Sequence, residues 1–296
     1  MWLPYHTSGS LKAETDAETI RLSRLDPAPR TFLVGFFLRN PVTQAWEADL
    51  RAEAAGTTLA CELGGAPAEV GFYGNDAGKL GEVLYRLTAT DPKEALRLAH
   101  EDLERRLAGF VIDTGRGMDI VGWRVADMTH GARWRCTPFR PSALAISYTD
   151  AATVPDDLRP LAALYKRTRN APDASYRLLC AYAILAEGAN PEGPISAEVR
   201  ESFTVTQELL IHSGAMEYAT LLAGKSLGEL VEFLRPEQDA LLAGSGRLRA
   251  LVLDQAAEQR LGLIANLADF AAHKLLGAEM RHREAAGLER SLQPTG

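Results

Sequence analysis

The spacing of apolar residues along the chain predicts strands in its first part. Short apolar runs alternate there with turn residues, and the clearest run, Thr31–Leu38, ends at Asn40-Pro41. Runs of this length bounded by turn signals are typical of buried strands. We predict strands over 31–38, 57–62, 68–73, 82–88, 118–128, 132–136 and 143–148.

One segment of the first half has helical spacing instead. Asp91 is suited to cap a helix, and Pro92 stands at its first position. The apolar residues that recur at intervals of three and four are Leu96, Ala99, Leu103 and Leu107. We predict a helix that ends at Gly109. Strands with one main helix packed on them give an α+β domain.

Strand signals stop after the polar segment 149–157, which contains Pro155. We place a domain boundary there and predict an α+β domain over 1–150 and an all-helical domain over 156–290. Over residues 226–243 we predict one or two helices, interrupted at Pro236. The last helix is predicted over roughly 257–284, ending in the charged residues from Arg281 to Arg290. The stripe that it buries consists of Leu261, Ile264, Leu267, Ala271, Leu275 and Ala278.

Composition narrows the class of protein. Hydrophobic residues make up 46% and charged residues 24%, which is typical of a globular chain. The formal net charge is −7, and both halves are negative, so we expect no nucleic acid partner held by bulk charge. No apolar run approaches the roughly 20 residues of a membrane span, and we find no signal peptide. With three cysteines and no CxxC pair, these features predict a cytoplasmic protein with reduced thiols.

A phosphate-binding loop is the first candidate for chemistry. Residues 219–226 end in Gly224-Lys225-Ser226 and fit the loosest form of that motif. The motif requires a preceding buried strand, and Ser213–Tyr218 does not have the pattern of one. We interpret the segment as a helix end followed by a newly capped helix, and we expect no cofactor.

The histidines give no metal motif. No two of the six lie four residues apart, and HExxH does not occur, so we expect no metal site. His212 follows Glu208 by one helical turn, which could present a carboxylate and an imidazole together. We assign no catalytic nucleophile, because Gly-x-Ser-x-Gly is absent and no cysteine has a histidine near it in sequence.

Basic and aromatic residues gather between Arg116 and Arg140. A cationic groove with stacking rings can hold a single nucleic acid strand. Neighbouring strand residues point to opposite faces, however, so Trp123 inward and Arg124 outward is the ordinary pattern of a half-buried sheet. We favour that structural interpretation.

The helical half resembles a known family. The segments Leu164–Asn170 and Tyr176–Gly188, with the later segments Thr204–Gly214 and Ile264–Leu276, are similar to methylamine utilisation protein J (MauJ). The resemblance implies a bacterial cytoplasmic accessory protein associated with amine metabolism. It implies no particular activity.

The same half also resembles the HEPN superfamily of compact helical domains, which act as ribonucleases or dimerise. Active members carry an arginine followed, after four to six residues, by a histidine. The spacing occurs only at Arg124-x5-His130, in the strand-rich half. The resemblance therefore implies a HEPN-like domain that lacks the nuclease motif.

These observations favour a non-catalytic accessory or binding protein that forms a homo-oligomer or binds a protein partner through its helical half. The alternative is an enzyme, either a divergent HEPN-type ribonuclease or an enzyme acting on a small molecule. The candidate binding residues are Arg177, Glu208, His212 and His273. Their convergence in one pocket would favour the enzyme, and their dispersal would favour the binding protein.

Overall fold

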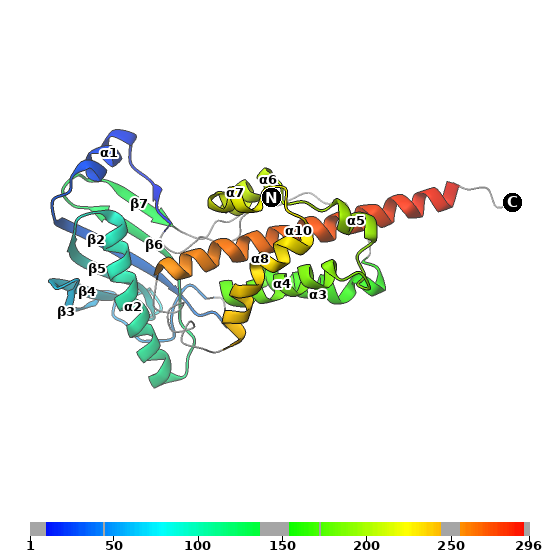
Figure 1. Cartoon of the computed structure of the whole chain (residues 1–296). Helices are drawn as coiled ribbons and strands as arrows, with labels where there is room; N and C mark the ends of the chain where they lie inside the picture. The colour runs from blue at the N-terminus through cyan, green and yellow to red at the C-terminus, as the bar shows by residue number, and fades with distance from the viewer. Residues whose placement is uncertain (1–9, 44, 137–153, 172, 244–254, 293–296) are drawn as a thin grey trace. The chain divides into compact units, whose positions relative to one another are not determined.

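The computed structural model describes residues 10–43, 45–136, 154–171, 173–243 and 255–292 (Figure 1). The chain divides into two compact units. Among the described residues, the first unit contains 10–43, 45–136 and 255–256, and the second contains 154–171, 173–243 and 257–292. The predicted strand 143–148 and most of the predicted boundary 149–157 lie outside the described residues. The position of that boundary stays a prediction.

The first unit is built on an antiparallel sheet. Its strands lie in the order β1-β7-β6-β2-β5-β4-β3, and each neighbouring pair is antiparallel. Their bounds are β1 (Lys12–Ala13), β2 (Arg30–Arg39), β3 (Thr57–Leu63), β4 (Ala66–Gly74), β5 (Leu80–Ala89), β6 (Asp119–Asp127) and β7 (Arg133–Cys136). Each strand predicted within the described residues is present, with bounds shifted by a few residues at most.

The core of this unit lies between the sheet and helix α2 (Pro92–Thr114), which runs across the strands in Figure 1. Strand β2 lies in the middle of the sheet, and its alternate residues Phe32, Val34, Phe36 and Leu38 are fully buried. The predicted helix face, Leu96, Ala99, Leu103 and Leu107, is buried as well. The α+β class predicted from the sequence is confirmed.

The predicted end of α2 at Gly109 is wrong. The helix continues to Thr114, and Gly115 ends it in the left-handed conformation with a φ of 66°. A glycine inside a helix costs only about 1 kcal/mol relative to alanine, so Gly109 weakens the helix without ending it. Gly115 ends it because glycine adopts positive φ without steric cost.

The sequence pattern missed helix α1 (Ala17–Leu25). Asp16 caps it by accepting a hydrogen bond from the N–H of Thr19. Only Ile20 and Ser23 of this helix are buried, so it offers almost no apolar periodicity to detect. Ser23 donates a hydrogen bond of 2.6 Å to buried Asp127, which attaches α1 to the end of β6.

The regular elements in the described part of the second unit are all helices, apart from a single bridge between Thr204 and Ser226. Its elements are η1 (Asp156–Leu158), α3 (Arg159–Asn170), α4 (Ala174–Ala189), α5 (Ala197–Ser202), α6 (Gln207–Ser213), η2 (Met216–Tyr218), α7 (Ala219–Leu222), α8 (Leu227–Leu242) and α10 (Gln255–Leu292). A helical region therefore follows the sheet, as predicted. No helix in the described part of the chain is long and apolar enough to cross a membrane.

Two boundaries in this unit differ from the prediction. Pro236 does not interrupt α8, because it lies on the exposed face, where water can solvate the carbonyl left without its helical bond. The charged residues after Arg281 do not end α10, which continues to Leu292. Charged pairs one turn apart support a helix, and Arg283 donates such a hydrogen bond to Glu279.

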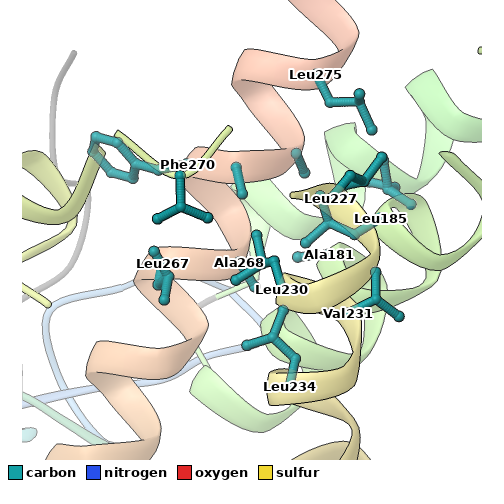
Figure 2. Packing of buried hydrophobic residues seen from close by; sticks show 14 of the residues in the cluster. Ala181, Leu185, Leu227, Leu230, Val231, Leu234, Leu267, Ala268, Phe270 and Leu275 are labelled. Atoms are coloured by element: carbon teal, nitrogen blue, oxygen red, sulfur yellow. The ribbon is translucent and has the colours of Figure 1, made fainter. Parts of the chain in front are cut away.

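Helices α4, α8 and α10 form the centre of this unit (Figure 2). In Figure 2, Ala268 of α10 lies on the side turned toward Leu230 of α8, whereas Leu267 lies on the same side as Phe270. The predicted stripe of α10 is buried from Leu261 to Leu275, and Phe270 beside it is buried too. The last member of the stripe, Ala278, is only partly buried.

Candidate functional site

A polar cluster interrupts the apolar surface of α10. Asn266, Asp269 and His273 follow one another at intervals of three and four residues, which places them along one side of the helix. Asn266 and Asp269 are almost completely buried, whereas His273 is exposed overall. Buried polar groups on a core helix are unusual enough to need a structural or functional reason.

Two arginines from other helices carry positive charge to this cluster. Arg169 at the end of α3 donates a hydrogen bond of 2.5 Å to Oδ2 of Asp269. Arg177, in the first turn of α4, is buried and close enough to act on the same carboxylate. Burial raises the pKa of Asp269, and the attraction of Arg169 and Arg177 offsets only part of that rise.

His273 stands at the exposed end of the cluster. Its ring stacks on that of Tyr165 from α3, with centroids 5.7 Å apart and planes 30° from parallel. Although the residue is exposed overall, this covered ring face makes burial the main effect on its pKa, which is lowered, and the nearby Arg169 charge lowers it further. His273 is therefore a neutral imidazole at pH 7.

Two buried acceptors remain available in the cluster. Oδ1 of Asn266 and Oδ1 of Asp269 accept no hydrogen bond from the described residues. Chemically, the cluster combines one carboxylate, two guanidiniums and one neutral imidazole. No group of three metal-ligating side chains is found among the described residues.

The structure brings together only part of the predicted site. Arg177 and His273 both lie near Asp269. Glu208 and His212 lie on α6, where both side chains are exposed and Nδ1 of His212 is 3.9 Å from Oε1 of Glu208. The ring of His212 lies 6.5 Å from that of Phe270, which is next to Asp269 in sequence.

Sequence reasoning missed Arg169, Asn266 and Asp269. A signal for two of them was present, because Asn266 and Asp269 are polar residues within the buried part of the longest apolar helix. No sequence signal identified Arg169, whose partner lies 100 positions away in the chain. Such pairs depend on how helices pack, which local spacing does not encode.

A second polar site borders the C-terminal half of α10. A cavity of about 470 Å³ is lined by Asp157, Gly193, Pro194, Ile195, Ser196, Glu279, His282, Arg283 and Ala286. Buried Glu279 accepts hydrogen bonds from the N–H and hydroxyl of Ser196, at 2.9 and 2.8 Å, and from Arg283 at 2.6 Å. Burial alone would raise the pKa of Glu279, but these bonds outweigh it and hold the pKa below its usual value.

The segment Gly224-Lys225-Ser226 has the structure predicted for it. Helix α7 ends at Leu222, and Ser226 caps α8 in a reciprocal arrangement with Glu229. Lys225 donates a hydrogen bond of 2.7 Å to the same carboxylate. The lysine and serine are thus used to start a helix, and no strand within the described residues leads into them.

The basic and aromatic cluster follows the alternation of a half-buried sheet. Trp123 and Trp134 are buried, while Arg124 is exposed and paired with Glu82. Arg135 is likewise exposed and pairs with Glu14 at 2.8 Å. The predicted inward tryptophans and outward arginines are confirmed, and the end of the cluster at Arg140 lies outside the described residues.

Comparison with protein families assigns both units to one class of protein. Residues 5–136 match the family model described as methylamine utilization protein MauJ, N-terminal domain. Residues 161–276 match the model described as methylamine utilization protein MauJ. The chain therefore belongs to the MauJ family, as the sequence resemblance indicated.

Similar proteins carry the same name over nearly their full length. The chain is 53% identical over 286 residues to the methylamine utilization protein MauJ of Paracoccus denitrificans, covering 97% of this chain and 98% of that protein. It is 51% identical to the MauJ of Paracoccus versutus, covering 96% and 97%, and 46% identical to that of Methylorubrum extorquens, covering 97% and 99%. No solved structure matches the chain significantly.

Proposed function

We propose that this chain is a non-catalytic, cytoplasmic accessory protein of methylamine utilisation that acts by binding a protein partner through its helical half. Its association with methylamine utilisation rests on the MauJ family and on relatives that match nearly its full length. The accessory role rests on how the chain uses its charged side chains.

The observation that carries this proposal is that three buried carboxylates, those of Glu279, Asp269 and Asp127, are each bound by other groups of the same chain. Glu279 is bound by Ser196 and Arg283, and one oxygen of Asp269 is bound by Arg169. In the sheet unit, Asp127 is bound by Arg30 at 2.7 Å. Acid–base catalysis requires a group within reach of a substrate proton, whereas these groups stabilise contacts between distant segments.

The surface proposed for the partner lies on α6, η2 and α7. These consecutive elements each leave a large apolar side chain exposed, namely Ile211, Met216 and Leu221. Exposed apolar side chains that gather in one region favour protein contacts. Glu208 and His212 on α6 supply polar groups at the same surface.

A growth experiment tests the proposal. A bacterium that encodes this chain would have the gene deleted and would be grown on methylamine and, separately, on a carbon source without an amine. We expect slower growth on methylamine alone, restored by the wild-type gene but not by a folded Ile211→Asp variant. Normal growth of the deletion strain on methylamine would contradict the association, and full rescue by Ile211→Asp would contradict the partner surface.

One observation favours an enzyme as a second candidate. Arg177 and His273 converge on Asp269, and a neutral histidine beside an arginine can serve a HEPN-type ribonuclease or another acid–base enzyme. We expect no cleavage when the protein is incubated with labelled single-stranded RNA at low salt without metal. Cleavage that disappears in both folded Arg177→Lys and His273→Ala variants would replace the accessory role with a catalytic one.

A further inference from the structure

The outer edge of β3 has no strand beside it in the described part of the chain. Sheet order places this strand at the end of the sheet, and among the described strands it pairs only with β4. Residues 57–60 are all exposed, the pairing with β4 runs without a bulge, and the strand contains no proline. Proteins usually protect such an edge with charges, proline or a bulge, and here Glu62 is its only charge.

The turn after β3 determines which backbone groups are free. Gly64 and Gly65 connect Leu63 to Ala66, with positive φ of 59° and 78°, as in a two-residue type I′ hairpin. The residue pair that closes such a hairpin exchanges backbone hydrogen bonds, and bonding alternates from there. Alternate residues back from Leu63 therefore bond β4, while Thr58, Ala60 and Glu62 direct their N–H and C=O groups outward. Pro67 agrees with this pattern, because it stands opposite Glu62, where no N–H is needed between the strands.

We propose that β3 pairs with β3 of a second copy of this chain, antiparallel, about a two-fold axis at Ala60. Ala60 then faces Ala60 of the second copy, and Thr58 faces Glu62 of the second copy. This register pairs all three outward-facing residues of both strands, and it allows the threonine hydroxyl to donate to the carboxylate. A slip of the strands leaves some of these residues unpaired, and the slip that places Glu62 opposite Glu62 also sets like charges together.

The β3 side chains on the α2 side of the sheet also favour pairing with a second copy of the chain. Leu59, Cys61 and Leu63 point to the side of the sheet that α2 covers, because alternate strand residues share a face. Leu63 is buried and Cys61 is partly buried, but Leu59 is 45% exposed. In the proposed register, Leu59 lies opposite Cys61 of the second copy, which extends the apolar layer and covers the exposed leucine.

This dimer surface is independent of the partner surface proposed on the helical half. It uses a strand of the sheet unit and remains open to a separate test, whatever the growth experiment shows. No residue belongs to both surfaces.

Disulfide trapping tests the register directly. Leu59 and Cys61 of the second copy form a non-hydrogen-bonded pair with Cα atoms about 4.5 Å apart, within the range that a disulfide spans. We expect the full-length Leu59→Cys variant to form a covalent dimer on mild oxidation, reversed by reductant. Adding Cys61→Ser should abolish the dimer, and Val42→Cys, at a site 83% exposed elsewhere on the unit, should give none. Failure of Leu59→Cys to cross-link would overturn the register.

Sedimentation tests whether the dimer exists without a cross-link. We expect the wild-type chain to sediment as a dimer and Ala60→Lys, which sets two lysines opposite each other, to sediment as a folded monomer. Ile112→Lys, at another exposed apolar residue, should remain dimeric. A monomeric wild type, or a dimer unaffected by Ala60→Lys, would overturn the proposal.

Discussion

Arg283 binds Asp157 through both terminal nitrogens of its guanidinium group. Nη1 donates to Oδ1 and Nη2 donates to Oδ2, each at 2.8 Å. Its Nε donates to Glu279, and Nη2 also donates to the carbonyl oxygen of Pro194. One side chain of α10 thus joins the first residues of the helical unit and the segment between α4 and α5. The paired carboxylates raise the pKa of Arg283, so this link stays charged across the physiological pH range.

The two carboxylates bound by Arg283 should differ sharply in their contribution to stability. Glu279 is 1% exposed and Asp157 is 55% exposed. Arg283→Ala leaves the buried Glu279 charge without its cationic partner, and we expect it to lower the free energy of unfolding by ~3–5 kcal/mol. Asp157→Asn breaks an exposed pair and should cost only ~0–1 kcal/mol. Urea denaturation measures both, and equal losses would contradict the account of the network.

His273 should make stability depend on pH. Its pKa is lowered in the folded protein from its ordinary value of about 6.5, so the unfolded chain binds the proton more readily. The corresponding stability is fully present above pH 6.5 and is lost as the pH falls through the lower folded pKa. When the pH is lowered from 7, we expect the free energy of unfolding, measured by urea titration, to fall less in His273→Gln than in the wild type.

Tyr165 provides the control for this pH effect, because its ring covers the His273 imidazole. Tyr165→Ala uncovers the ring and should bring the pH dependence closer to that of His273→Gln. The account of the cluster would be wrong if wild type and His273→Gln lost stability in parallel on acidification.

Leu267 should be among the most sensitive core positions of the helical unit. Its side chain is completely buried between α10 and its neighbours. Leu267→Ala should therefore lower the free energy of unfolding by ~2–5 kcal/mol. Leu221→Ala, at a site 56% exposed, is the matched control and should change it by less than about 0.5 kcal/mol. A loss below about 1 kcal/mol at Leu267 would mean that the stripe is loosely packed.

Local spacing predicted the elements better than their ends. The start of α2 followed from Asp91-Pro92, because a cap and a proline act on the residues next to them. Its end depended on whether Gly109 or Gly115 would take the left-handed conformation, and sequence alone does not decide between two glycines. Helix α10 was predicted to end too early, because its charged residues after Arg281 were interpreted as the end of the helix. The hydrogen bond between Arg283 and Glu279, one turn apart, instead supports a longer helix.

The candidate site was predictable only in part. Arg177 and His273 were chosen by residue type, and the structure places both near Asp269, which the sequence analysis did not select. Glu208 and His212 were chosen by spacing, and that spacing produced only an exposed pair on α6. Contacts between α3, α4 and α10 arise from tertiary packing, so neither Arg169 nor its pairing with Asp269 could be found from local sequence.

The most direct measurement of the central claim is growth on methylamine of the deletion strain carrying His273→Ala. His273 is the exposed acid–base group of the polar cluster, so its removal would disable an enzyme built there and leave the surface on α6, η2 and α7 intact. A non-catalytic accessory protein predicts growth at the wild-type rate. A His273→Ala protein that is folded and present at the normal level, yet fails to restore growth, would contradict the claim.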